Sequence, residues 1–386
     1  MRIGVPLEQT AGEKRVALHP QVVQPLIRLG AQVVVQAGAG RQAGLGDAAF
    51  AQAGAAVEAD VQSVWQMCDI MLKVAPPRRH SNGLNEIECL RKGQLCIGLL
   101  DPLGDPQHLE LLAARGAHLF AMELIPRTSR AQAMDALSSQ ANLMGYSSVL
   151  LAANHLCKLL PMLMTAAGTV GPAQVLVVGA GVAGLQAIAT AKRLGARVFA
   201  YDVRPAVQQQ VHSLGARFVD IAVQESAAGE GGYAQQVSQS VLQQQQAGLA
   251  KVAQNMDIVI TTALVPGMKA PVLITQQALT NMKPGSVVVD LACSSGGNVA
   301  GSQPNKTVDV QGVTVLGPTN LTASLCADAS LLYARNLLAL LRLLLCDGKL
   351  TLTTNDDIVT SCCVAQQGKV THPRVLHMLQ QAKEVG

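Results

Sequence analysis

The sequence predicts an α/β fold with two domains, each built on a parallel sheet and joined by long helices. Two observations predict it. Short runs of buried-strand character alternate with helical patterns in both halves of the chain, and this alternation is typical of parallel sheets. At about 150 residues per domain, a length of 386 residues also favours two or three domains over one.

The first domain is expected over residues 1–137 together with 325–386. Apolar runs of four or five residues predict its strands, and helical patterns predict two early helices. The strands are expected at 3–6, 32–36, 70–74, 95–99 and 118–121, and the helices at 20–29 and 47–53. The tail contains an alternating segment at 358–364, and we expect the tail to pack back on this domain.

The second domain is expected over residues 138–324. Its strands are expected at 174–178, 197–202, 257–262, 286–291 and 313–317. Helical patterns at about 127–165 and 323–345 are long enough to bridge the two domains. Segment 220–246 is too rich in glycine and glutamine for a core element, which is typical of a lid or a contact loop.

Charge and composition exclude several classes of protein. Only 2% of the residues are aromatic and the net charge is +4, which argues against nucleic-acid binding. The nine cysteines include no CxxC pair, so we expect reduced thiols, no metal site and a cytoplasmic location. The longest apolar stretches, 149–163 and 331–345, contain polar or charged residues, so neither predicts a membrane span. The mean hydropathy of +0.28 leaves room for a protein partner on the surface.

A dinucleotide-binding fingerprint follows the first strand of the second domain. It consists of Gly179, Gly181 and Gly184, then an apolar-periodic helix and a strand that ends in Asp202. The first glycine allows a tight turn, the second lets the backbone approach a pyrophosphate, and the third lets helix and strand pack closely. Asp202 is placed to bind the adenosine ribose and to repel a 2′-phosphate. The second domain is therefore predicted to be a Rossmann domain that prefers NAD(H), although Arg204 is a basic residue of the kind that can signal a 2′-phosphate.

A second motif precedes the Rossmann domain, in the run RTSRAQAMDALS from Arg127 to Ser138. Read as the start of a helix, the run places Gln132, Asp135 and Ser138 on roughly one face, because they are spaced by three residues. The same pattern also fits an exposed helix whose arginines pair with Asp135.

This run and several other segments together resemble the NAD(H)-binding alpha-subunit component of proton-translocating nicotinamide nucleotide transhydrogenases. The other segments are the glycine fingerprint, DVR, GGYA, DIVITTALVPG and MKPGSVVVDLA, with EKRVALHPQVV near the start and IVTSCCVAQQGKVTHP near the end. The similarity covers nearly the whole chain, and the RxxRAQxMD run is more specific than the glycine fingerprint.

The resemblance implies roles for individual residues. Arg127, Gln132, Asp135 and Ser138 are expected to hold the nicotinamide and its ribose for hydride transfer, which makes them the candidate catalytic residues. The residues expected to bind NAD(H) are Arg127, Thr128, Ser129, Arg130, Gln132, Asp135, Gly179, Gly181, Val182, Gly184, Asp202, Val203, Arg204, Gly232, Tyr233 and Leu264. Gly232 and Tyr233 fall in the segment that in this family is a mobile loop closing over the nucleotide.

The resemblance also implies partners. It predicts a homodimer that docks on membrane-embedded proton-channel subunits and on a beta subunit that binds NADP(H). Such a chain would be cytoplasmic, held at the cytoplasmic face of the inner membrane through those subunits. Hydride would pass directly between NADH and NADP⁺, coupled to proton movement, and the chain would be active only with its partners.

Two other functions stay open at this stage: a stand-alone alanine dehydrogenase, which shares this two-domain fold, and a catalytically silent NAD-binding regulator. Arg15 and Lys73 resemble the substrate-binding pair of the dehydrogenase. Reductive amination needs an acid/base group, however, and Cys96 and Leu99 lie where that family carries its catalytic histidine. The nearest candidate, His108, lies on a helical pattern. The intact RAQxMD run and the lid argue against a silent regulator.

One segment departs from the family's pattern. Thr322, Ala323 and Ser324 stand where relatives typically carry Pro-Ser-Arg. An arginine expected near the site or the domain hinge is therefore missing, which bears on the strength of nucleotide binding and on full activity.

Overall fold

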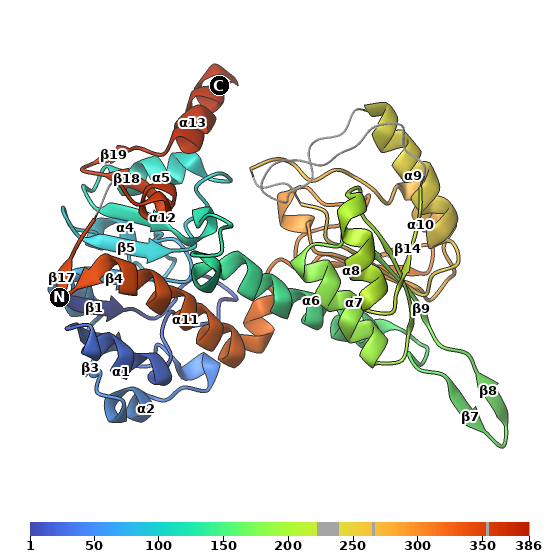
Figure 1. Cartoon of the computed structure of the whole chain (residues 1–386), viewed down its shortest axis with the longest axis horizontal. Coiled ribbons are helices and arrows are strands. Elements are labelled where there is room, and N and C mark those ends of the chain that lie inside the picture. Colours follow the sequence, from blue (N-terminus) through green and yellow to red (C-terminus); the bar gives the residue numbers. More distant parts are fainter. Residues whose placement is uncertain (222–238, 265–266, 353–354, 386) are drawn as a thin grey trace. The chain divides into compact units, whose positions relative to one another are not determined.

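The computed structural model describes residues 1–221, 239–264, 267–352 and 355–385, and it divides into two compact units (Figure 1). The first unit contains Met1–Gln140 and Thr322–Gly386, and the second contains Ala141–Leu321. The chain leaves the first unit within helix α6 (Ala136–His155) and returns to it in the 3-10 turn η7 (Leu321–Leu325). Each unit holds a sheet in which parallel pairing dominates, so the predicted α/β fold class is confirmed.

The first unit is built on an eight-stranded sheet in the order β19-β18-β6-β5-β4-β1-β2-β3. Its strands are β1 (Arg2–Val5), β2 (Gln32–Gln36), β3 (Ala56–Glu58), β4 (Ile70–Leu72), β5 (Leu95–Gly98), β6 (His118–Ala121), β18 (Cys363–Gln366) and β19 (Lys369–Val370). The strands from β6 to β3 pair in parallel, as expected for apolar runs separated by helices. The tail adds β18 antiparallel to β6, with Cys363 opposite Phe120.

Helices cover the sheet of the first unit. They are α1 (Pro20–Arg28), α2 (Asp47–Gln52), α3 (Val61–Met67), α4 (Glu86–Cys89), α5 (Pro106–Ala113), α11 (Cys326–Leu344), α12 (Asp357–Cys362) and α13 (Pro373–Val385). Proline at the first helical position begins α1 and α5. The carboxylate of Asp60 begins α3 by accepting hydrogen bonds from the backbone amides of Gln62 and Ser63.

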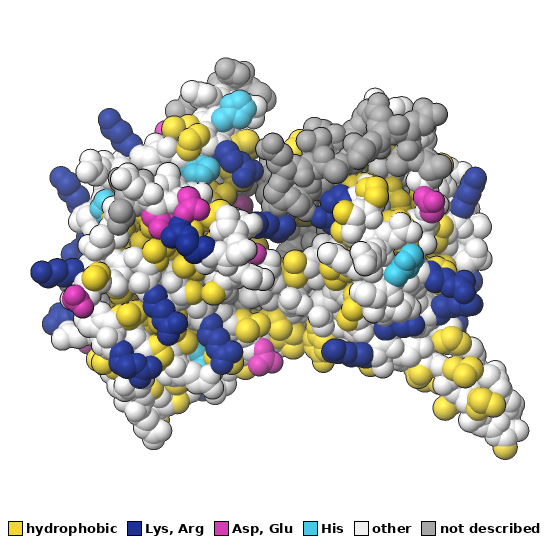
Figure 2. Space-filling model, viewed as in Figure 1, with side chains coloured by type: hydrophobic (Ala, Val, Ile, Leu, Met, Phe, Trp, Pro, Cys, Tyr) yellow, Lys and Arg dark blue, Asp and Glu magenta, His cyan; other side chains and the backbone are white. Residues whose placement is uncertain are grey.

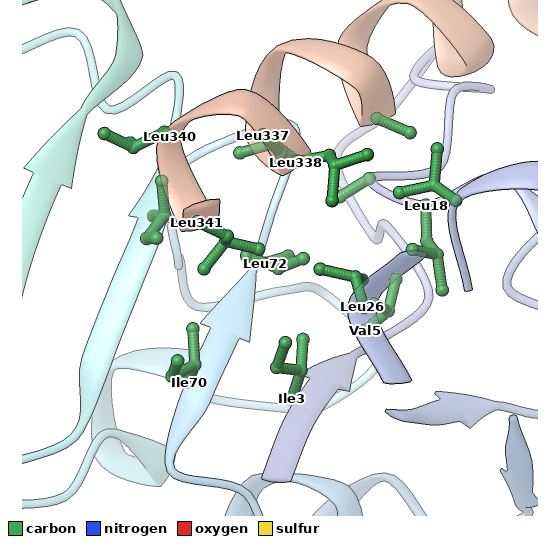
Figure 3. Close-up of a cluster of buried hydrophobic side chains, with 14 of the residues drawn as sticks. Ile3, Val5, Leu18, Leu26, Ile70, Leu72, Leu337, Leu338, Leu340 and Leu341 are labelled. Carbon is green, nitrogen blue, oxygen red and sulfur yellow. The ribbon is translucent and has the colours of Figure 1, made fainter. Parts of the chain in front are cut away.

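Helix α11 lies at the centre of the first unit's hydrophobic core. Figure 3 shows Leu341 of this helix next to Leu72 of β4, and Leu337, Ile3 of β1 and Ile70 of β4 belong to the same buried cluster. Burying a leucine stabilises a fold by about 1.5–3 kcal/mol. By length and composition the segment Leu321–Leu344 is long and apolar enough to cross a membrane, but half of its most apolar stretch is buried inside the protein. Core packing therefore accounts for the apolar sequence of α11.

The second unit is built on a seven-stranded sheet in the order β11-β10-β9-β12-β13-β15-β14. Its strands are β9 (Gln174–Val178), β10 (Arg197–Tyr201), β11 (Arg217–Phe218), β12 (Ile258–Thr261), β13 (Val287–Asp290), β14 (Thr307–Val310) and β15 (Val313–Leu316). Its other helices are α7 (Val182–Arg193), α8 (Gln208–Ser213), α9 (Gln239–Ala253) and α10 (Gln276–Thr280). From β9 the chain adds β10 and β11 on one side of the sheet and then β12 and β13 on the other, so the strand order changes direction between β9 and β12. Open α/β sheets bind ligands beyond the carboxyl ends of the strands where the order changes direction.

The helix expected over 127–165 is wrong at both ends. Residues 127–135 form a loop with a short 3-10 turn, Gln132–Met134, and α6 begins only at Ala136. After His155 the chain forms an antiparallel hairpin of β7 (Leu163–Thr165) and β8 (Gly168–Val170). Gly168 has a φ of 122°, a conformation that only glycine adopts readily, and this turn reverses the chain.

Candidate functional site

The three fingerprint glycines each occupy a place that a side chain would disturb in a different way. Gly179 directly follows β9 and has a φ of 97°, so it makes the tight turn. A Cβ atom at Gly184 would overlap the carbonyl oxygen of Gly179, so the third glycine permits the close packing of helix and turn. A Cβ atom at Gly181 would meet no other atom within 4 Å. The backbone at Gly181 therefore faces open space at the start of α7.

The amino terminus of α7 has the features that a pyrophosphate needs. Gly181 is the N-cap residue, and no side chain of the described residues caps the helix there. The first backbone N–H groups of a helix lack partners within it, and the helix dipole favours an anion at this end. Gly145 of α6 lies so close to the carbonyl of Ala183 that a Cβ atom would overlap it, which fixes α6 against this end of α7. The glycine loop thus fits the pyrophosphate of a dinucleotide.

Asp202 lies at the carboxyl end of β10, beside the glycine loop. Its carboxylate accepts a hydrogen bond from the backbone amide of Ala180 at 2.7 Å. It also accepts hydrogen bonds from the backbone amide of Arg204 at 2.8 Å and from that residue's guanidinium, with Nε and Nη2 each at 2.9 Å. The hydrogen bond to Asp202 raises the pKa of Arg204, although partial burial lowers it. The acidic residue is where the sequence predicted, but it is already paired.

A buried polar network that was not predicted from the amino-acid sequence organises the loop after β12. Asp290, fully buried at the end of β13, accepts hydrogen bonds from the hydroxyls of Thr261 and Ser302 and from the backbone amide of Asn298. The side-chain amide of Asn298 binds Ala263 twice. Its oxygen accepts a hydrogen bond from the backbone N–H of Ala263 at 3.0 Å, and its nitrogen donates one to the backbone carbonyl of Ala263 at 2.9 Å. It also donates to the carbonyl of Pro271 at 2.8 Å.

Asn298 thus joins both ends of the loop that carries Leu264, a predicted nucleotide contact with 41% of its surface exposed. The turn SSGGN after the strand is the one sequence signal that points to Asn298. Predicted contacts Gly232 and Tyr233 lie outside the described residues. Val182, the first residue of α7, and Val203, which follows Asp202, are both half-buried.

The RxxRAQxMD run lies in the first unit. Asp135 begins α6, because its carboxylate accepts hydrogen bonds from the backbone amide of Ser138 at 2.9 Å and from its hydroxyl at 2.6 Å. Gln132 and the residues from Arg127 to Arg130 are exposed, whereas Asp135 and Ser138 are half-buried. The structure therefore gathers polar groups here in a loop and a helix N-cap, not on one helix face as the spacing suggested.

Arg130 does not pair with Asp135, as the alternative interpretation of this run required. Its guanidinium pairs with Asp356 at 2.7 Å and also with Asp357, and both carboxylates belong to the tail. The hydrogen bond to Asp356 raises the pKa of Arg130. Arg130 thus fastens the loop to the start of α12.

Arg15 and Lys73, which resemble the dehydrogenase's substrate-binding pair, each bind a carboxylate of the chain itself. The Lys73 ammonium is fully buried, 3.0 Å from Glu8 and 2.7 Å from Glu86. Burial lowers the pKa of Lys73, but the two carboxylates outweigh burial and raise it above its ordinary value. The Arg15 guanidinium lies 2.6 Å from Glu13.

The acid/base group of a dehydrogenase is likewise missing from the described residues at this place. Cys96 is buried in β5, and burial raises the pKa of its thiol to about 12. The imidazole of His108 on α5 is 2.8 Å from the carbonyl of Pro77. The Cys96 thiol therefore stays protonated at neutral pH and is a poor proton acceptor for a substrate amine, and the His108 imidazole is held by a backbone carbonyl.

The segment that departs from the family pattern forms the 3-10 turn before α11. Thr322 and Ala323 are buried and Ser324 is exposed. The small side chains of Thr322 and Ala323 are thus buried at the point where the chain returns to the first unit.

The chain is similar to known proteins in both sequence and structure. Models of the alanine dehydrogenase/PNT N-terminal and C-terminal domains match residues 4–144 and 148–373. The chain is 45% identical over 377 residues to the first of the parts that make up NAD(P) transhydrogenase subunit alpha from Rhodospirillum rubrum, a match that covers 97% of this chain and 98% of the relative. It resembles the crystal structure of transhydrogenase from Sinorhizobium meliloti with a TM-score of 0.84, 42% identity and coverage of 97% and 99%. Alanine dehydrogenase from Mycolicibacterium smegmatis is more distant, at 33% identity over 79% of this chain and 76% of the relative.

Proposed function

The chain belongs to the alanine dehydrogenase/PNT family, and from this premise we propose that it acts as the NAD(H)-binding component of a transhydrogenase that exchanges hydride with NADP(H) on a partner subunit. Among relatives, those named as transhydrogenase alpha subunits are more similar to it than the alanine dehydrogenases are. The family binds NAD(H), and the open glycine loop fits that nucleotide.

The observation that carries this proposal is that Lys73 and Arg15 already bind carboxylates of the chain. An amino-acid dehydrogenase needs free cations to hold the substrate carboxylate and a group that moves protons. Hydride transfer between two nicotinamides moves no proton at the reacting carbons, so it needs aligned rings and exclusion of water. The open glycine loop supports nucleotide binding, whereas Arg15 and Lys73, the two cations that resemble an amino-acid-binding pair, are already paired.

The residues proposed to hold NAD(H) divide between the two units. Gly181, Val182 and Asp202 of the second unit would bind the pyrophosphate and adenosine. Gln132 and Asp135 of the first unit, with their neighbours Arg127 and Ser138, would bind the nicotinamide and its ribose. Bound NADH supplies the hydride, and the protein's contribution is to position the ring.

The transfer reaction can be tested directly with purified components. The chain alone should bind NADH and turn over neither alanine nor pyruvate with ammonia. Mixed with the NADP(H)-binding component of a transhydrogenase, it should exchange hydride between the two nucleotides. Gln132→Asn and Asp135→Asn should slow hydride transfer by about 100-fold while changing NADH affinity less, because a misplacement of about 1 Å can cost that much in rate.

Two controls separate catalysis from folding. Asparagine caps helices as well as aspartate does, so Asp135→Asn preserves the start of α6 while it removes the charge. Gln52→Asn, the same change on the exposed end of α2, should leave the rate unchanged. Oxidation of alanine by the isolated chain would overturn the proposal in favour of the dehydrogenase, and NADH binding without either activity would favour the silent regulator.

We further propose that the protein is a homodimer and that it docks on membrane-embedded proton-channel subunits and an NADP(H)-binding beta subunit. The Rhodospirillum relative is named as one portion of an alpha subunit, and such a name supports a complex with other subunits. Location at the cytoplasmic face of the inner membrane would then follow from that docking.

The hairpin β7–β8 supports the homodimer. Exposed apolar side chains cluster on this hairpin and on the segment before it, and Figure 2 shows them along the arm. They are Leu159 (46% exposed), Met162 (58%), Leu163 (44%), Met164 (73%) and Val170 (44%). A two-stranded ribbon is marginally stable alone, and a contiguous apolar surface of this kind marks a protein interface.

Sedimentation tests the hairpin's role. The wild-type chain should have twice the monomer mass of 40.2 kDa at micromolar concentration. Met164→Glu should give a monomer, because an interface that buries an unpaired carboxylate is strongly disfavoured. Leu111→Glu is the matched control, since Leu111 is 60% exposed on α5 of the first unit. A dimer that survives Met164→Glu would mean that the hairpin is not the interface.

A further inference from the structure

The carboxylate of Asp202 has no acceptor position left for a ribose. A carboxylate offers about four positions for hydrogen bonds. Its four donors are the backbone amides of Ala180 and Arg204 and two nitrogens of the Arg204 guanidinium, all within 2.7–2.9 Å. An adenosine ribose brings two hydroxyl donors to the same carboxylate, so it must displace donors that are already there.

Of these donors, the guanidinium alone can leave without unfolding the site. The amide of Ala180 belongs to the glycine loop, and the amide of Arg204 belongs to the backbone three residues after Tyr201, where β10 ends. The Arg204 side chain is 20% exposed, against 5% for Asp202, so it has a path to solvent. A side chain that rotates costs far less than a backbone that moves.

We propose that Arg204 is a latch on the adenosine subsite, which must leave Asp202 when NAD(H) binds and which sets the selectivity between NAD(H) and NADP(H). The proposal rests on the proposed nucleotide-binding function. With the latch closed, the pair has no net charge and Asp202 repels a 2′-phosphate less than a bare carboxylate would. With the latch open, the guanidinium is a cation close to the subsite, and guanidinium groups bind phosphate in bidentate fashion.

Selectivity therefore has two opposing contributions at this strand end. Asp202 favours the ribose diol of NADH, and Arg204 both competes with that diol and attracts a 2′-phosphate. Removing Arg204 should help NADH and harm NADPH, whereas removing Asp202 should do the opposite. A residue with a merely structural role would change both affinities in the same direction.

Fluorescence titration of NADH and NADPH tests the latch in the full chain. In Arg204→Met the NADH affinity should rise about threefold or more, and the ratio of the NADPH to the NADH dissociation constants should grow about tenfold, because a hydrogen bond to a charged group contributes about 1.5–3 kcal/mol. Arg204→Lys, which keeps the charge but cannot form the fork, should give an intermediate ratio. Arg197→Met at the opposite end of β10 is the matched control and should leave the ratio unchanged.

The possible outcomes distinguish failure of the Arg204 latch from failure of the proposed nucleotide-binding function. Weakening of both nucleotides by the same factor in Arg204→Met, at an unchanged melting temperature, would overturn the latch and make Arg204 an ordinary contact. An unchanged ratio in both Arg204 variants would overturn it as well. A wild-type chain that binds neither nucleotide would instead refute the proposed function. Should Arg204→Met fold poorly, the ratio in Arg204→Lys decides the latch by itself.

Discussion

Replacing Lys73 by methionine is expected to lower the free energy of unfolding of the first unit by about 3–5 kcal/mol, the usual cost of removing one partner from a buried ion pair. Methionine fills a similar volume, so the loss arises from charge and not from a cavity. The variant leaves Glu8 and Glu86 buried without their cation. Trp65 is the single tryptophan and is fully buried in the first unit, so its fluorescence during urea denaturation reports on this unit.

The loss in Lys73→Met should also depend on pH. Burial raises the pKa of Glu8, and Lys73 partly offsets that effect. Without Lys73 the pKa of Glu8 rises further above its unfolded value, and a group of this kind destabilises the fold as pH rises from the unfolded pKa through the folded one. The destabilisation should therefore be smaller at pH 5 than at pH 8.

An exposed ion pair of the same unit provides the control. Arg78 and Asp105 are 3.1 Å apart, with side chains that are 42% and 38% exposed. Exposed pairs contribute about 0–1 kcal/mol, so Arg78→Met should cost no more than that. Equal costs for Arg78→Met and Lys73→Met would contradict a buried triad at Lys73.

Substitution of Gly184 by alanine should destabilise the second unit by about 3 kcal/mol, at the upper end of the usual cost of overpacking. The added methyl group would overlap the Gly179 carbonyl, which is backbone and has no rotamer to escape into. Helix α7 must then move away from β9, so the glycine loop loses its shape and NADH binding is lost. Thermal melting followed by circular dichroism, with NADH titration, measures both effects.

Gly181→Ala separates the two roles of the fingerprint. A Cβ atom there meets nothing within 4 Å, and the φ of −75° suits any residue. Stability should therefore change by less than about 1 kcal/mol, the range for a helix N-cap. NADH affinity should nevertheless fall about tenfold or more, because the methyl group occupies the space that the pyrophosphate needs. Unchanged affinity in Gly181→Ala would show that the nucleotide does not approach this loop.

Features that depend on local backbone geometry and on periodicity could be predicted from the amino-acid sequence. As the spacing of the fingerprint predicted, Gly179 has a positive φ, Gly181 faces open space, and Gly184 lies at a close approach of helix and turn. The strands at 32–36, 118–121 and 174–178 have the predicted bounds, because buried parallel strands are short apolar runs. The family was recognisable for the same reason, since its motifs are contiguous.

Tertiary structure alone decided which charged groups are already paired. Arg130 and Asp356 are 226 positions apart, and Glu8 meets Lys73 because β1 pairs with β4. Such partners are chosen by chain topology, and no periodicity along the sequence encodes them. The hairpin β7–β8 escaped prediction because its strands of three residues are exposed and lack the alternation that marks a half-buried strand. Asp202 was located from sequence, but its occupation by Arg204 depends on side-chain conformation, which spacing does not specify.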